Sequence, residues 1–208
     1  MSTIVRQTKT EDIKAAGEVL KQGGIVAFPT DTVYGLGAVF DDEKAVRKIF
    51  AAKGREEKKP LSILVADIVQ VELLSEIKSG EMAQKAERLM KKFWPGALTL
   101  IFQKKPGIPD AVTAGGETIG IRMPDMELTR ELIRAAGKPL AAPSANTSGK
   151  RSSVSAREVL EDLDGKIDMV IDGGTCPVGV ASTVVDMTGE TPVILREGVI
   201  TAEMIAQA

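Results

Sequence analysis

Apolar residues recur at helical spacing and at strand spacing in turn along this chain, and that alternation limits the fold more than any other sequence feature. Ile13, Ala16 and Leu20 form one apolar face of a helix, and residues 25–28 form a short continuous apolar run typical of a buried strand. The two patterns keep interleaving toward residue 208. Chains of this kind fold as α/β proteins, with helices packed on a sheet.

The expected elements follow from the same periodicity and from capping residues. Thr10 and Ser155 are predicted helix caps, Ser155 opening a capping box with Glu158, and Gly54 is a predicted helix end. Helices are expected at 10–22, 43–53, 81–93 and 128–136, after Ser155, and near Thr201. Strands are expected at 25–28, 61–65, 97–102, 118–123, 140–142, 169–171, 182–185 and 193–195.

These strands cluster in the middle of the chain and near its end, so the order is no clean βαβ alternation. We therefore predict a single domain over residues 1–208, of the α/β class in its α+β form, built on a mixed, strongly twisted sheet. No apolar run approaches the roughly 18–20 residues that cross a bilayer. The N-terminal segment lacks a signal-peptide pattern, so we expect a cytoplasmic protein with no membrane partner.

The absence of histidine restricts the chemistry available to this chain. It excludes Ser-His-Asp and Cys-His catalysis, most transition-metal sites and the commonest neutral-pH base. The single cysteine, Cys176, excludes an internal disulfide framework and is interpreted as a packed residue. A net charge of −2 argues against a chain-wide field for nucleic acid but leaves room for a local basic patch.

Four polar segments follow or adjoin the expected strands. They are FPTDTVYGLG at 28–37, KGREEKKPL at 53–61, PSANTSG at 143–149 and GVASTVVD at 179–186, and Arg122 and Arg196 end two further apolar runs. Each segment alone is equally typical of a turn or a solvated basic loop. Ser144 and Asn146, two residues apart on an extended chain, are expected to share one side. Asp31 is interpreted as a solvated carboxylate, together with Asp41 and Asp42.

Taken together, these segments predict a concave site rich in Lys, Arg and hydroxyl groups, without a metal cage. No phosphate-binding GxxxxGK[ST] loop and no GxGxxG turn after a strand is present in the sequence. Such a site suits a ligand that carries phosphate, because arginine presents a planar fork to phosphate oxygens and lysine a compact charge.

The same segments closely resemble the YrdC-like family of threonylcarbamoyl-AMP synthases. The matching motifs are PTDTVYGLG, KGR, KPL, WPGALTL, GIRMP, APSAN, DGG, GVASTVVD and LREG, in family order from Pro29 to Gly198. Two positions depart from the family pattern. Glu56 stands where many relatives have proline, and Leu64 falls where some relatives have a histidine near threonine.

The resemblance implies a YrdC-like fold with a basic concave face. It also implies a nucleotidyltransferase that makes threonylcarbamoyl-AMP and pyrophosphate from L-threonine, bicarbonate and ATP, with Mg²⁺ bound alongside ATP. The product would supply the machinery that modifies a tRNA adenosine to threonylcarbamoyladenosine. The carbamate is already an anion, so its attack on phosphorus needs positioning and charge cancellation rather than a side-chain base.

By the same resemblance, particular residues carry the site. The implied catalytic residues are Lys53, Arg55, Ser144 and Asn146. The implied threonine contacts are Thr32, Arg122, Ala142 and Ser182, Arg122 pairing with the carboxylate. The implied nucleotide contacts are Arg55, Lys59, Thr118, Ser144, Ser152 and Arg196, and no residue is assigned to the metal itself.

Two other functions stay open at this point. A YciO-like protein of the same fold would use the basic concavity to bind double-stranded RNA or tRNA without making the adenylate, although few aromatic residues are present to stack on bases. An enzyme acting on another carbamoyl donor is the third alternative.

Overall fold

The structure is a computed structural model that describes residues 2–77 and 79–208. Its helices are α1 (Thr10–Lys21), α2 (Glu43–Lys53), α3 (Val69–Leu74), α4 (Glu81–Phe93), α5 (Asp110–Thr113), α6 (Glu127–Ala136), α7 (Ala156–Leu163) and α8 (Ala202–Ala206). Its strands are β1 (Ile4–Arg6), β2 (Val26–Phe28), β3 (Gly35–Val39), β4 (Ser62–Leu64), β5 (Ser75–Glu76), β6 (Leu98–Lys104), β7 (Thr118–Arg122), β8 (Leu140–Ala141), β9 (Met169–Ile171), β10 (Thr183–Asp186) and β11 (Val193–Arg196).

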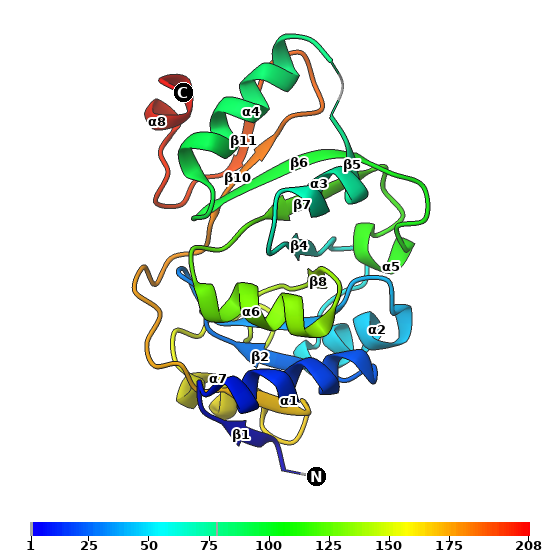
Figure 1. Cartoon of the computed structure of the whole chain (residues 1–208), viewed down its shortest axis with the longest axis vertical. Coiled ribbons are helices and arrows are strands. Elements are labelled where there is room, and N and C mark those ends of the chain that lie inside the picture. Colours follow the sequence, from blue (N-terminus) through cyan, green and yellow to red (C-terminus); the bar gives the residue numbers. More distant parts are fainter. Residues whose placement is uncertain (1, 78) are drawn as a thin grey trace.

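The strands form one sheet in the order β1-β9-β2-β3-β8-β4-β7-β6-β10-β11, with β5 added beside β6. Four pairs are parallel (β1–β9, β2–β9, β4–β7 and β6–β10), and the other pairs are antiparallel. The prediction of an α/β fold with a mixed sheet is therefore confirmed. Figure 1 shows the sheet running along the long axis of the molecule.

The hydrophobic core divides between the two faces of the sheet, because neighbouring residues of a strand point to opposite sides. In β2, Val26 and Phe28 pack in the cluster that includes Leu20 of α1 and Leu132 of α6. The next residue along, Ala27, belongs to the larger cluster that contains Ile49 of α2 and Val159 of α7. Helices α1 and α6 lie side by side over the first face (Figure 1).

Two of the three predicted helix termini are confirmed, at Gly54 and Ser155, and Asp42 is a cap that the sequence analysis did not predict. Asp42 accepts a hydrogen bond from the Ala45 amide at the start of α2, and Gly54 ends that helix with φ 59°. Ser155 caps α7 by accepting from the Glu158 amide. The prediction that Thr10 caps α1 is wrong: the helix begins at Thr10, and the preceding Lys9 supplies only its backbone carbonyl.

Five elements were not expected from the sequence: β1, β3, α3, β5 and α5. Four of them are short. Strand β3 is longer but rich in glycine, which weakens the strand pattern. Its glycines are explained by packing, since a Cβ on Gly37 would lie 2.6 Å from the Phe28 ring. Among the described residues, no helix is long and apolar enough to cross a membrane.

The contact between α1 and α6 predicts a stability effect at Gly17. A Cβ built on Gly17 would lie 2.7 Å from Ala135 Cβ and 2.8 Å from the Ala135 carbonyl carbon. Overpacking of this kind costs about 1–3 kcal/mol, whereas replacing a helical glycine with alanine gains at most about 1 kcal/mol. We therefore expect Gly17→Ala to lower the free energy of unfolding in urea titrations followed by circular dichroism. Exposed Lys14→Ala on the same helix is the control, and a more stable Gly17→Ala variant would contradict the packing argument.

Candidate functional site

An open pocket lies over the middle of the sheet, with a volume of about 830 Å³ that includes its solvent-facing mouth. The pairing register of neighbouring strands determines which side chains line one side of the pocket. Leu64 pairs with Arg122, Thr99 with Val184, and Val184 with Arg196. Leu100 pairs with Ile121, so the next step along β7 brings Arg122 beside Thr99. Because paired residues point to the same face, this row of side chains lines the pocket together.

Eight of the residues predicted for the site line this pocket. They are Thr32, Arg55, Arg122, Ala142, Ser144, Ser152, Ser182 and Arg196. They come from loops and strand ends far apart in the sequence. The segment between β2 and β3 carries Thr32, the segment after α2 carries Arg55, and the segment after β8 carries Ala142 and Ser144.

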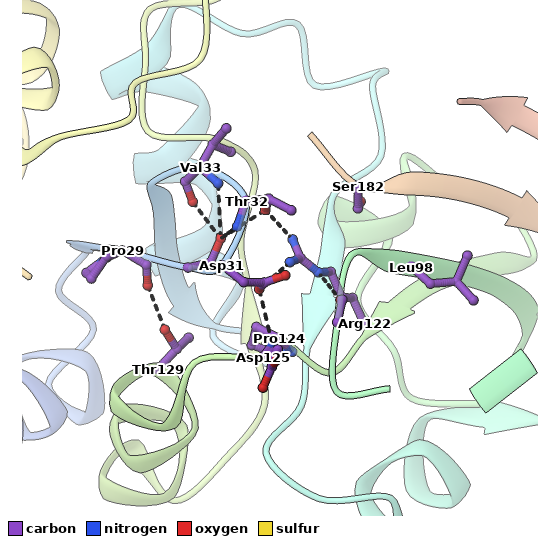
Figure 2. A network of polar contacts seen from close by, with 12 residues as sticks. Pro29, Asp31, Thr32, Val33, Leu98, Arg122, Pro124, Asp125, Thr129 and Ser182 are labelled. Atoms are coloured by element: carbon purple, nitrogen blue, oxygen red, sulfur yellow. Dashed lines mark hydrogen bonds and ion pairs between the residues drawn. The ribbon is translucent and has the colours of Figure 1, made fainter. Parts of the chain in front are cut away.

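A buried ion pair between Arg122 and Asp31 anchors the pocket (Figure 2). The Arg122 Nη2 donates to Asp31 Oδ1 at 2.5 Å, Nη1 donates to Thr32 Oγ1 at 2.6 Å, and Nε donates to the Gly96 carbonyl at 2.8 Å. The Asp125 amide donates to the same Asp31 oxygen at 3.1 Å. The interpretation of Asp31 as a solvated carboxylate is therefore wrong, since the residue is only 7% exposed.

Burial lowers the pKa of Arg122 from its usual value, and the adjacent Asp31 opposes that shift. The guanidinium nevertheless stays protonated, because the starting pKa of arginine is so high. Its three bonds to Asp31, Thr32 and Gly96 use three of the five N–H groups that a guanidinium carries, which leaves two without a hydrogen-bond acceptor among the described residues. Arg122 therefore has both a protein partner and free donors.

Arg55 and Arg196 complete the cationic lining. Arg55 Nη2 donates to the Pro60 carbonyl at 3.0 Å, and Arg196 Nε donates to the Ser182 carbonyl at 3.0 Å. Burial lowers the pKa of both guanidinium groups. Neither forms a salt bridge with a carboxylate of the described residues. Three guanidinium groups thus line the pocket, and the one carboxylate paired with them, Asp31, is not part of the lining, an arrangement that favours an anionic ligand.

Hydroxyl groups lie between these arginines. Ser182 Oγ lies 2.8 Å from Thr99 Oγ1, and Arg196 Nη2 donates to Ser182 Oγ at 3.3 Å. Thr99 was missed at the sequence level because a threonine inside a strand is fully explained by β propensity. Asp31 offered a signal that could have been used, since it stands between two threonines in a segment already selected as polar.

Four predicted site residues do not line the pocket: Lys53, Lys59, Thr118 and Asn146. Lys59 is exposed and lies 3.9 Å from Glu56, and Thr118 begins β7 at the end of the strand away from Arg122. Lys53 ends α2 and is 2% exposed, and its Nζ donates to the carbonyl oxygens of Ser144 and Asn146, at 2.5 Å each.

The expectation that Ser144 and Asn146 share one side of an extended chain is wrong. The chain bends at residues 145–146, so the two-residue spacing of a strand does not apply there. Ser144 lines the pocket, whereas the Asn146 side-chain amide donates to the carbonyls of Thr147 at 2.9 Å and Lys150 at 3.0 Å. The Asn146 Oδ1 atom is buried and accepts no hydrogen bond from the described residues.

The side chains that line the pocket are compatible with a metal ion that binds together with a phosphate-bearing ligand. No cluster of three or more His, Cys, Asp or Glu residues occurs in the part of the chain that the structure describes. Mg²⁺ is commonly held by substrate phosphates and waters with few protein ligands. The lining of arginines and hydroxyls therefore fits a magnesium nucleotide rather than a separate metal cage.

Comparisons with known proteins identify relatives of this chain by sequence and by fold. The Sua5/YciO/YrdC family model, described as "Telomere recombination", matches residues 18–198. A Bacillus subtilis relative named threonylcarbamoyl-AMP synthase is 50% identical over 199 residues, which cover 95% of this chain and 56% of the relative. The crystal structure of P. abyssi Sua5 complexed with L-threonine has a TM-score of 0.94 at 44% identity, covering 99% of this chain and 60% of that one. The structure of E. coli YciO has a TM-score of 0.83 at 28% identity, covering 96% and 97%.

Fold and pocket define a mixed α/β domain that gathers arginine and hydroxyl groups over its sheet to receive an anion. The chain belongs to the Sua5/YciO/YrdC family, as the order of its motifs predicted. It spans a little more than half the length of the B. subtilis relative and of P. abyssi Sua5.

We predict that loss of the Asp31–Arg122 ion pair strongly destabilises the fold. Removing one partner of a buried pair leaves an uncompensated charge, which costs about 3–5 kcal/mol. We expect Asp31→Ala to lower the free energy of unfolding by about that amount in chemical denaturation. Glu57, which follows α2 and forms an exposed ion pair with Arg47 of that helix, is the matched control, and Glu57→Ala is expected to cost less than about 1 kcal/mol. Equal losses in both variants would contradict the importance of burial.

Lys53 predicts a pH dependence of stability. Burial, and then the charge of Arg55, lower its pKa from 10.5 to about 8. Between these two values the unfolded chain binds a proton that the folded protein does not, so stability rises with pH across that window. We expect the free energy of unfolding of the wild type to increase from pH 8 toward pH 10.5 relative to Lys53→Met. A parallel pH profile for the two proteins would contradict the lowered pKa.

Proposed function

We propose that this chain is a nucleotidyltransferase that forms threonylcarbamoyl-AMP and pyrophosphate from L-threonine, bicarbonate and ATP. The observation that carries the proposal is the pocket itself. It combines two arginines that have no carboxylate partner among the described residues with a third, Arg122, two of whose N–H groups have no acceptor in that part of the chain, beside Thr32 and Ser182. The likeness to a B. subtilis threonylcarbamoyl-AMP synthase and to a Sua5 crystallised with L-threonine supports the same assignment.

The reaction suits a site without histidine. Carbon dioxide from bicarbonate adds to the threonine amine to give a carbamate, whose oxygen attacks the α-phosphorus of ATP. The bond to the β-phosphate oxygen breaks, and pyrophosphate leaves. Since the attacking carbamate is already anionic, the site has to align the reactants and offset negative charge. Preorganised arginine and hydroxyl donors provide that stabilisation, and Mg²⁺ enters with ATP as part of the substrate.

We assign threonine and the nucleotide phosphates to different arginines of the pocket. Arg122 receives the carboxylate of threonine through its two remaining N–H groups, with Thr32 and Ser182 beside it. Arg55 and Arg196 face the phosphates, together with Ser144 and Ser152. Lys59 and Thr118 stay as proposed nucleotide contacts that would require movement of their segments, because neither lines the pocket. Leu64 gives the threonine end an apolar wall.

The chemistry of the proposed product implies a later step that consumes it. Threonylcarbamoyl-AMP is a mixed anhydride, and we propose that it is consumed by machinery that transfers the threonylcarbamoyl group to a tRNA adenosine in the cytoplasm. We also propose that residues 1–208 act as a single domain, since all strands of the described residues join one sheet. The alternative of RNA binding without synthesis is not favoured, because the relative at 50% identity is named a synthase and the likeness to YciO is weaker, at 28% identity.

The proposal is tested by incubating purified protein with MgATP, L-threonine and bicarbonate. We expect pyrophosphate release and a threonylcarbamoyl-AMP signal in mass spectrometry only when all three substrates are present. Arg55→Met should lower kcat/KM by about 100-fold or more, because it removes a pocket cation without a carboxylate partner. Arg157→Met is the control for loss of an arginine, since Arg157 is exposed on α7 and pairs with Glu161. Absence of product from the wild type, or full activity of Arg55→Met, would refute the assignment.

A further inference from the structure

Lys53 and Arg55 stand two residues apart, yet they meet different surroundings. Arg55 lines the pocket and donates to the carbonyls of Lys59 and Pro60 beside it. Lys53 does not line the pocket and is 2% exposed. Gly54 separates them with a left-handed backbone conformation, φ 59°, which ends α2 and turns the chain. The two cations therefore cannot be treated as one phosphate-binding pair.

Lys53 holds the segment from 142 to 150, which we call the 142–150 loop, at three points. Its Nζ donates to the Ser144 carbonyl and to the Asn146 carbonyl. Its own backbone carbonyl accepts from the Ser148 amide at 2.8 Å. Two of the three N–H groups of the ammonium are thereby used inside the protein.

The 142–150 loop in turn forms the side of the pocket next to the β2–β3 segment. Ser144 lines the pocket and forms an isolated bridge with Gly35. The Ala145 amide donates to the Tyr34 carbonyl at 2.7 Å, and the Ser153 hydroxyl donates to the Ala145 carbonyl at 2.9 Å. The Leu36 amide donates to the Pro143 carbonyl at 2.9 Å, so peptide groups on both sides of Ser144 are held, and Lys53 adds a donor to the Ser144 carbonyl itself.

Turning Lys53 toward a phosphate would break these contacts. It would leave the Ser144 and Asn146 carbonyls without their ammonium donor in a largely buried place, and each unpaired buried group carries a desolvation penalty. The hydrogen bonds therefore keep the ammonium against the loop.

We propose that Lys53 is a positioning residue: its ammonium holds the carbonyls of Ser144 and Asn146 and so sets Ser144 against the pocket, while Arg55 meets the anionic ligand directly. The reaction that this arrangement serves rests on the proposed function. The arrangement itself does not, because it concerns a contact within this chain beside a pocket lined by arginines.

A double-mutant cycle on product formation separates the two roles. Misplacement of a reacting group by about 1 Å can cost about 100-fold in rate, so we expect Lys53→Met to lower kcat by roughly 100-fold. If Lys53 acts through Ser144, adding Ser144→Ala to Lys53→Met should cause little further loss, since contacting residues are coupled. The control cycle of Arg157→Met with Ser144→Ala should show the full loss caused by Ser144→Ala, because Arg157 is exposed on α7 and shares no partner with Ser144. Multiplicative losses in the Lys53 cycle would overturn the proposal.

Nucleotide affinity supplies a readout that is independent of the reaction. We expect the dissociation constant of a non-hydrolysable ATP analogue, measured by calorimetry with Mg²⁺, to change by less than about threefold in Lys53→Met and by more than about tenfold in Arg55→Met. A loss of affinity in Lys53→Met as large as that in Arg55→Met would show that Lys53 contacts phosphate, and the proposal would fail. These measurements stand even if the wild type makes no threonylcarbamoyl-AMP, so the two proposals fail separately.

The wild type provides a second test should Lys53→Met not fold. Hydrogen exchange of peptides covering the 142–150 loop is compared with and without the same ATP analogue. If the ammonium stays on the loop, the amides of this loop keep or gain protection when the analogue binds. Loss of protection confined to this loop would mean that Lys53 leaves it for the phosphates, and the proposal would be wrong.

Discussion

The buried ion pair between Arg122 and Asp31 is the interaction on which the pocket depends. A guanidinium at the end of β7 would be costly to bury alone, and the segment between β2 and β3 folds back over the sheet to provide the carboxylate. The same guanidinium holds Thr32 and the Gly96 carbonyl, so three segments distant in sequence meet at one side chain. The charge of Arg122 is thereby balanced, and three protein acceptors set the orientation of its guanidinium (Figure 2).

Strand register then determines what stands beside Arg122. Leu64, Arg122, Thr99, Val184 and Arg196 come from five strands and form one row because of how β4, β7, β6, β10 and β11 pair. A shift of one residue in any of these pairings would turn the side chain to the opposite face of the sheet. The apolar neighbours of these residues, such as Ile63, Leu100 and Val185, are buried in the core on that opposite face, and their burial maintains the register. The packing of the core and the composition of the pocket are therefore two consequences of one pairing pattern.

The positive charges around the pocket differ in burial, and burial separates their roles. Arg55 and Arg196 keep contact with the pocket and use only carbonyl or hydroxyl acceptors, so their charge is available to a ligand. Lys53 is enclosed and satisfied by two carbonyls of the 142–150 loop. A compact ammonium suits that task because its donors can be divided between two acceptors on one loop, whereas a planar guanidinium suits the oxygens of a phosphate or a carboxylate.

The sequence by itself determined the fold class, the main helices with most of their caps, and the set of polar segments from which the site is made. These features depend on local periodicity and on residue chemistry, and the motifs of the Sua5/YciO/YrdC family lie in those same segments. Only the tertiary structure decided that Asp31 is a buried partner of Arg122 and that Thr99 lines the pocket. It also decided that Arg55 and Ser144 line the pocket, whereas the side chains of Lys53 and Asn146 form hydrogen bonds with the 142–150 loop. These positions depend on strand register and on one bend of the chain. Long-range packing sets both, so the spacing of residues along the sequence does not predict which side chains line the pocket.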